Sequence, residues 1–208
     1  MRMREEALGG RVTTPYYSDE AVTIYHGDAR DIMPTLPKVD LVLTDPPYPN
    51  TSGHFLEGIE MARDVLSRCR GPVMTFWSTV EHPPCPAPLR AIHVWHRTNV
   101  NGRIVEFCYE FGEGGRKRDE LIAGPAIFDG AGPGANEYLG HPTQKPRHVM
   151  RRLIEIAGSH ETILDPFMGS GTTLRACKDL GRKAIGIEIE ERYCEIAAKR
   201  MSQLAMAL

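Results

Sequence analysis

The sequence has no long apolar run, although hydrophobic residues make up 41% of its 208 positions. A membrane-spanning helix requires roughly 20 apolar residues in succession, so none is predicted. The first ten residues, MRMREEALGG, carry charges that no apolar stretch follows, which argues against a secretory signal. We therefore expect a cytoplasmic protein that makes no contact with a membrane.

Cysteine is scarce and charge is nearly balanced. The five cysteines are odd in number and widely scattered, which favours reduced thiols. The formal net charge is −2, so composition alone gives no indication of nucleic-acid binding. Two local patches are basic: residues 141–152, with four lysines or arginines and no acid, and GGRKR at 114–118. Each can attract phosphates, or can be a solvated helix face or loop.

Segments with strand and helix patterns alternate along the chain without an internal repeat. This alternation predicts one α/β domain with a largely parallel sheet. The predicted strands cover residues 21–29, 39–43, 71–77, 91–96, 103–111, 161–167 and 182–189. The predicted helices cover residues 29–37, 54–69, 146–157, 169–181 (after a turn) and a last segment from about 190. The proline-rich stretch 82–88 is predicted to be irregular, and the glycine-rich stretch 112–140 to be a loop.

The stretch TDPPYPN follows the predicted strand at 39–43 and places an acid, two prolines and a tyrosine in a row. Two adjacent prolines fix two φ angles and remove two backbone donors, which is more stiffness than a solvated turn needs. The carboxyl ends of parallel strands are where open α/β sheets bind ligands. The structural alternative is a stiffened loop with a helix-capping aspartate.

The stretch ILDPFMGSGTT joins a predicted strand to a predicted helix. Gly169 and Gly171 allow a ligand close to the backbone, beside the free N–H groups of a helix N-terminus. No lysine follows the glycines, which argues against a P-loop, and Leu174 replaces the third glycine of a dinucleotide fold. S-adenosylmethionine fits better, because Asp165 precedes the turn and Glu188 ends the next strand, where an acid can bind ribose hydroxyls. A purely structural turn is the alternative.

Asp45, Pro46 and Tyr48 fit a reaction at the exocyclic amine of a nucleobase. The lone pair of such an amine is delocalised into the ring, and two fixed acceptors, the Asp45 carboxylate and the Pro46 carbonyl, can draw its hydrogens out of conjugation. The same acceptors stabilise positive charge that develops on the nitrogen. Tyr48 offers a ring face on which a flipped base can stack, worth about 1–3 kcal/mol. The pattern therefore predicts direct, in-line methyl transfer from sulfonium to nitrogen without a covalent intermediate.

In this order, TDPPY, HPTQKP and LDPFMGSGTT resemble the motifs of the β-class DNA amino-methyltransferases, in which the catalytic block precedes the cofactor block. The resemblance extends from about Val22 to Arg200. It implies a Rossmann-like methyltransferase fold with a mostly parallel sheet, one antiparallel strand and a circularly permuted motif order. It also implies a single catalytic domain over residues 1–208, in which a short loop at about 112–140 stands in place of the target-recognition region.

The resemblance also implies roles for individual residues. The catalytic tetrapeptide is matched by Asp45, Pro46, Pro47 and Tyr48. The residues implied to bind S-adenosylmethionine, which leaves as S-adenosylhomocysteine, are Asp165, Phe167, Gly169, Gly171 and Thr172 in the turn, Glu188 at the ribose, Asp28 at the adenine, and Thr143 and Lys145 at the methionine end.

The sequence departs from the family pattern in one respect. Family members usually carry a sizeable recognition region before the HPTQKP segment, whereas this chain offers only about residues 112–140. We therefore expect one of two situations. Either the recognised DNA sequence is short and degenerate, or another chain supplies recognition, as a restriction or recognition partner or as the second subunit of a homodimer.

The target base is predicted from the first residue of the tetrapeptide. Aspartate in DPPY is more typical of enzymes that act on N6 of adenine, and serine is more typical of enzymes that act on N4 of cytosine, so we expect adenine in DNA. Three alternatives stay open: methylation of cytosine N4, methylation of RNA or protein, and a non-catalytic module that binds S-adenosylmethionine or DNA.

Two further patterns are set aside. Pro84-Cys85 is the dipeptide that serves as nucleophile in cytosine-C5 methyltransferases, but its usual companions are missing and the DPPY chemistry needs no thiolate. The spacing of the histidines near Cys85 suggests zinc, but His93 and His96 lie three apart on a predicted strand and so point to opposite faces. We expect no metal site. Two aromatic residues are assigned to the core: Trp77 and Trp95.

Overall fold

A computed structural model of the chain describes residues 14–47, 56–77, 81–98, 105–115, 117–124 and 144–203. Within these ranges the elements follow one another as β1 (Tyr17–Ser18), β2 (Val22–His26), α1 (Ala29–Ile32) with a 3-10 turn (Met33–Thr35), β3 (Leu41–Thr44), α2 (Leu56–Arg68), β4 (Val73–Trp77), β5 (Leu89–Arg97), β6 (Val105–Phe111), β7 (Leu121–Gly124), α3 (Arg147–Ala157), β8 (Thr162–Asp165), α4 (Thr172–Asp179), β9 (Lys183–Glu188) and α5 (Glu191–Ser202).

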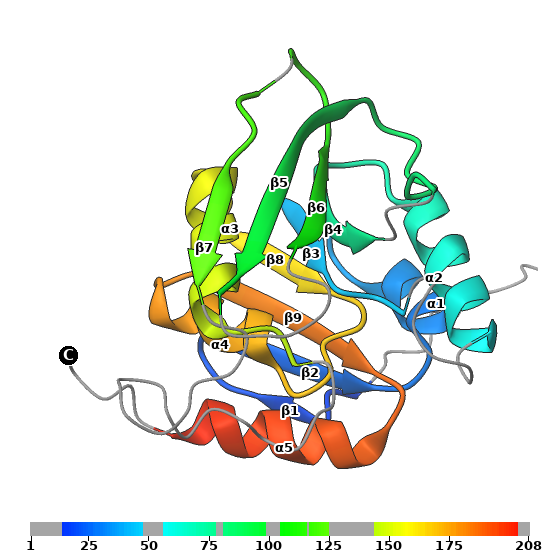
Figure 1. Cartoon of the computed structure of the whole chain (residues 1–208). Coiled ribbons are helices and arrows are strands. Elements are labelled where there is room, and N and C mark those ends of the chain that lie inside the picture. Colours follow the sequence, from blue (N-terminus) through cyan, green and yellow to red (C-terminus); the bar gives the residue numbers. More distant parts are fainter. Residues whose placement is uncertain are drawn as a thin grey trace, which may run out of the picture.

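The described strands form one sheet in the order β1-β2-β9-β8-β3-β4-β6-β5-β7 (Figure 1). Strands β2, β9, β8, β3 and β4 are parallel, and β5 and β7 run in the same direction. Strand β6 is antiparallel to both of its neighbours. The predicted α/β fold with a mostly parallel sheet is confirmed.

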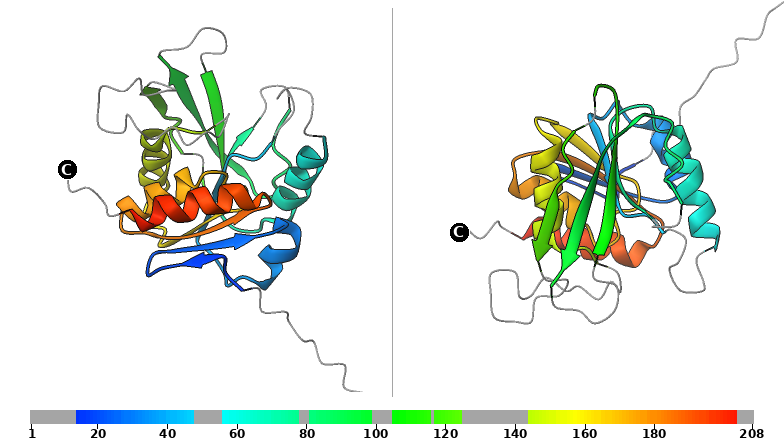
Figure 2. Two further views of the ribbon diagram at one scale, coloured as in Figure 1. Left: turned by 90° about the horizontal axis from the view of Figure 1, so that it is seen from below. Right: turned by 45° about the horizontal axis from the view of Figure 1, so that its top comes forward.

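Helices cover both faces of the sheet. Helices α1 and α2 lie on one face, and α3, α4 and α5 lie together on the other (Figure 2). Strands β3 and β4 are buried along their whole length, because helices cover both faces of the sheet. Strands that are buried on both faces are apolar at almost every position. This explains why LVLT and VMTFW show no alternation of polar and apolar residues.

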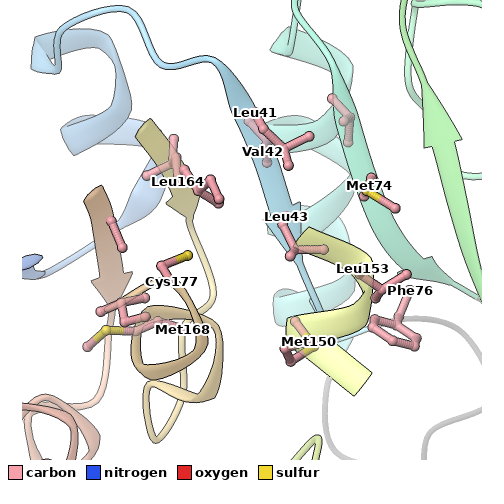
Figure 3. Close-up of a cluster of buried hydrophobic side chains, with 14 of the residues drawn as sticks. Leu41, Val42, Leu43, Met74, Phe76, Met150, Leu153, Leu164, Met168 and Cys177 are labelled. Carbon is pink, nitrogen blue, oxygen red and sulfur yellow. The ribbon is translucent and has the colours of Figure 1, made fainter. Parts of the chain in front are cut away.

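The middle of the sheet is the centre of the core. Figure 3 shows Leu43 of β3 and Phe76 of β4 grouped with Met150 and Leu153 of α3, and all four side chains are buried. Strand β3 lies between β8 and β4, with Leu41 opposite Ile163. This register brings the end of β3, where the DPPY motif begins, next to the end of β8, where the glycine turn begins.

The structure differs from the sequence prediction in two places. The stretch 112–140 was predicted to be a loop throughout, but it contains β7, which extends the sheet by pairing with β5. The short edge strand β1 was not predicted, and it runs antiparallel to β2, so β6 is not the single antiparallel strand that was expected. The irregular path of residues 82–88 is as predicted. Among the helices that the structure describes, none combines the length and the apolar character needed to cross a membrane.

Candidate active site

An open pocket lies where β3 and β8 end. Residues predicted for catalysis and residues predicted for cofactor binding both line it. The predicted residues among its lining are Asp45, Lys145, Asp165, Phe167, Gly169 and Thr172. The two motifs are more than 100 residues apart in the sequence, and the parallel pairing of β3 with β8 brings them to one cavity.

Asp45 follows β3 directly and holds its two carboxylate oxygens in different environments. The Lys145 ammonium donates to Oδ2 at 2.5 Å. Oδ1 is buried and accepts no hydrogen bond from any residue that the structure describes. Burial raises the pKa of the Asp45 carboxyl, and the ammonium of Lys145 opposes this increase. Pro46 and Pro47 continue the chain without a backbone N–H to offer.

Lys145 contacts Asp45 in the structure, and its predicted contact with the methionine end of the cofactor stays a prediction. Its ammonium lies 3.1 Å from Oε2 of Glu106 on β6 and 4.7 Å from the centre of the Phe76 ring. The neighbouring Gln144 accepts a hydrogen bond from Ser170 in the glycine turn at 3.1 Å. Gln144 and Lys145, which are adjacent in the sequence, therefore connect the glycine turn with the DPPY motif.

Asp165, at the end of β8, is buried and accepts three hydrogen bonds. Thr44 and Thr173 donate through their hydroxyls at 2.7 and 2.5 Å, and the backbone N–H of Phe167 donates at 3.1 Å. Burial raises the pKa of Asp165 to about 6, although the three donors oppose this shift. Because Thr44 ends β3 and precedes Asp45, this carboxyl links the end of β3 to the glycine turn.

The raised pKa of Asp165 predicts a pH dependence of stability. The folded carboxyl titrates at about 6 and the free one at 3.8, so between these values the folded state binds more protons than the unfolded state. The free energy of unfolding should therefore fall as pH rises through this range, by about 3 kcal/mol for this group. Asp165→Asn removes the titration, and other groups cancel in the comparison with the parent protein. Denaturant unfolding from pH 4 to 7 should show the difference growing in favour of the variant, and a constant difference would contradict this assignment.

The glycine turn adopts the backbone conformations that its sequence predicts. Gly169 and Gly171 have φ angles of +51° and +78°, in the left-handed region that favours glycine. Gly171 is the N-cap of α4, and Thr172 begins that helix. Glu188 accepts hydrogen bonds from the backbone N–H groups of Gly169 at 3.0 Å and Glu190 at 2.9 Å, and burial raises its pKa. Glu188 thus holds the turn and ends β9 beside it.

The remaining predicted residues lie apart from the pocket or outside the described residues. Asp28 caps α1 and pairs with the Arg30 guanidinium at 2.5 Å, which lowers the pKa of Asp28. It is not among the residues that line the pocket, and its role at the adenine stays a prediction. Tyr48 and Thr143 lie outside the described residues, so their roles stay predictions.

Residues 73–199, more than half of the chain, match the DNA methylase family N6_N4_Mtase. The chain belongs to this family. Among its relatives, the Type II methyltransferase M.ScaI of Streptomyces caespitosus is 26% identical over 273 residues, which cover 98% of this chain and 88% of M.ScaI. The DNA adenine methyltransferase YhdJ of Escherichia coli (strain K12) is 44% identical over 68 residues, which cover 32% of this chain and 23% of YhdJ.

Two of the solved structures that are similar to this DNA methylase are those of M1.HpyAVI and of PvuII methyltransferase. The crystal structure of the M1.HpyAVI–SAM complex superimposes with a TM-score of 0.67 at 26% identity, covering 88% of this chain and all of that one. The cytosine-N4-specific PvuII DNA methyltransferase has a TM-score of 0.69 at 16% identity, covering 94% of this chain and 92% of that one. The second likeness, at this low identity, concerns the fold alone.

Several residues that line the methylase pocket or contact its lining were not predicted from the sequence. They are Thr44, Phe76, Glu106, Gln144, Ser170 and Thr173. Thr44 and Thr173 lie within the motifs TDPPY and LDPFMGSGTT, so hydroxyls near a buried acid could have been a signal. Glu106 has no such signal, because it lies in an apolar strand with no motif around it and meets Lys145 only in the folded sheet.

The structure shows the surroundings of Cys85 and His93, for which a nucleophile and a zinc site were considered, and of the two tryptophans. Burial raises the pKa of the Cys85 thiol, which disfavours the thiolate that nucleophilic chemistry requires. His93 is fully buried on β5 and contacts Glu110 at 3.1 Å. Trp77 and Trp95 are buried, which confirms their assignment to the core.

Proposed function

We propose that this DNA methylase transfers a methyl group from S-adenosylmethionine to the exocyclic N6 amine of adenine in DNA. The observation that carries the proposal is the shared pocket, in which the Asp45 carboxylate and the turn at Gly169 face one cavity. The buried Oδ1 of Asp45, which no described donor contacts, supports it as an acceptor for the amine.

The residues of the glycine turn fit S-adenosylmethionine. Positive φ angles at Gly169 and Gly171 bring backbone close to the pocket, and Asp165 and Glu188 hold that backbone in place. We assign these four residues, with Phe167 and Thr172, to cofactor binding. When bound there, the cofactor supplies an electrophilic methyl group on a sulfonium.

The catalytic motif prepares the amine for attack. Asp45 Oδ1 and the Pro46 carbonyl accept the two amine hydrogens, which turns the nitrogen lone pair out of conjugation. Fixed acceptors cost no reorganisation when positive charge develops on the nitrogen. We assign stacking of the flipped base to Tyr48. The oriented amine would be the nucleophile for the methyl group that the bound cofactor supplies, S-adenosylhomocysteine would leave, and the surplus proton of the nitrogen would pass to water.

Adenine is favoured over cytosine by the aspartate in the motif. The relative YhdJ, a DNA adenine methyltransferase that is 44% identical over 68 residues, supports this choice. Methylation of cytosine N4 is the second candidate, since PvuII methyltransferase has the same fold and acts on that atom.

The domain organisation is part of the proposal. The alignment with M.ScaI is 273 residues long, whereas this chain has 208, so M.ScaI carries extra sequence within the matched region. We propose that residues 1–208 act as a single permuted catalytic domain with a reduced recognition loop near 112–140. A homodimer or a recognition partner would then complete the DNA interface.

Mass spectrometry of nucleosides tests the function. Duplex DNA of mixed sequence, incubated with the protein and S-adenosylmethionine, should yield N6-methyl-2′-deoxyadenosine after digestion to nucleosides. N4-methyl-2′-deoxycytidine as the only product would favour the second candidate. No methylated base in DNA, together with methylation of RNA or protein, would reject both.

A further inference from the structure

Three ionisable side chains from separate parts of the chain meet beside the pocket. Asp45 follows β3, Glu106 lies on β6, and Lys145 immediately precedes the N-cap of α3. The ammonium of Lys145 lies 2.5 Å from Asp45 Oδ2 and 3.1 Å from Glu106 Oε2. The Lys145 side chain is only 8% exposed, so water screens these contacts little.

The ammonium restricts how the Asp45 carboxylate can turn. With Oδ2 held by Lys145, Oδ1 is the oxygen that remains for another donor, and it has none among the described residues. A carboxylate that rotated freely would present either oxygen. The chemistry requires that one oxygen stays directed at the target nitrogen. Lys145 therefore orients the acceptor.

The same ammonium creates an electrostatic problem that Glu106 solves. Positive charge develops on the target amine, and a lone ammonium next to Asp45 would cancel the negative charge that stabilises it. Glu106 places a second carboxylate 3.1 Å from that ammonium. The other oxygen of Glu106 lies 3.3 Å from the Arg97 guanidinium, which fixes its position.

We propose that Glu106 is a positioning residue of the methylase: acting through Lys145, it holds Asp45 with Oδ1 free, and its own carboxylate keeps the combined charge of Asp45, Lys145 and Glu106 negative. The inference rests on the proposed function, because it assigns Glu106 to the same site. Charges then alternate from Glu106 to Lys145, to Asp45 and to the target amine.

Glu106→Gln tests the inference, and Glu110→Gln is its matched control. Both replace a glutamate on β6 by its amide, but Glu110 pairs with His93 and Lys117. At saturating cofactor and DNA, Glu106→Gln should lower the single-turnover rate at least about tenfold, with KM values changed less than about twofold. Glu110→Gln should keep the rate. In a Lys145→Met background, Glu106→Gln should cause little further loss, because the ammonium that transmits its effect is absent.

A carboxyl NMR titration of Asp45 provides a readout that needs no DNA. Glu106 raises the pKa of Asp45, so Glu106→Gln should lower it, whereas Glu110→Gln should not. Within the described ranges, the other ionisable groups that interact with Asp45 are Lys145, Asp165 and Cys108, and all are unchanged in both variants. An unmoved Asp45 titration, or an unchanged rate in an active protein, would overturn the inference. A parent protein that methylates no DNA while the titration moves as expected would reject the proposed function and retain the charge coupling.

Discussion

Replacing Asp45 by alanine is expected to lower the rate of methyl transfer by about 10²–10³-fold, the loss typical of removing one preorganised group that stabilises transition-state charge. The fold should tolerate the change, because Lys145 keeps Glu106 as a counter-charge. Binding of S-adenosylmethionine, measured by calorimetry, should change little, since the backbone of the turn is untouched. The rate is measured in a single turnover with labelled cofactor and duplex DNA.

Asp45→Asn serves as the graded control. The amide keeps one acceptor oxygen and loses the negative charge, so its rate should lie between those of the parent and of Asp45→Ala. If both variants methylate DNA at the parent rate, Asp45 takes no part in the reaction and the proposed mechanism is wrong.

Replacing Gly171 by alanine is expected to destabilise the protein and to weaken cofactor binding. A Cβ at this position would lie 2.9 Å from the Cβ of Ala197 on α5, closer than two carbons can approach. Overpacking of this kind costs about 1–3 kcal/mol, and a left-handed backbone adds about 1–2 kcal/mol for any residue with a Cβ. Because Gly171 caps α4, the forced shift moves the helix N-terminus that adjoins the pocket.

Gly181→Ala separates the two contributions to this loss. Gly181 has a similar φ angle of +67°, but a Cβ there meets nothing within 4 Å. Urea unfolding should therefore show a smaller loss for Gly181→Ala, about 1–2 kcal/mol, and its cofactor affinity should match that of the parent. Equal losses of stability and equal cofactor affinities in the two variants would show that packing against α5 does not set the position of the turn.

Much of the pocket could be predicted because short sequence motifs determine local backbone. The apolar run LVLT gives β3, the prolines after Asp45 end it, and the glycines after Asp165 form the turn before α4. Parallel strands end at one edge of a sheet, so two motifs that follow strands are expected to lie near each other. The shared pocket agrees with that expectation.

The electrostatic environment of Asp45 could not be predicted in the same way. Lys145 is 100 residues from Asp45 in the sequence, and Glu106 lies on a strand separated from β3 by β4. Which side chains of an apolar strand reach a pocket depends on strand order and register, which composition does not encode. Strand β7 was missed for a related reason: its pairing with β5 overrides the loop-like composition of the sequence around it.

The most direct test of the proposed chemistry is a crystal structure with S-adenosylhomocysteine and duplex DNA bound. We expect the cofactor sulfur beside the turn at Gly169, with the amine of a flipped adenine in line with it and within hydrogen-bond distance of Asp45 Oδ1. A cofactor and a flipped base in separate cavities, with Asp45 too far from the amine to accept its proton, would contradict the shared pocket as the place of reaction.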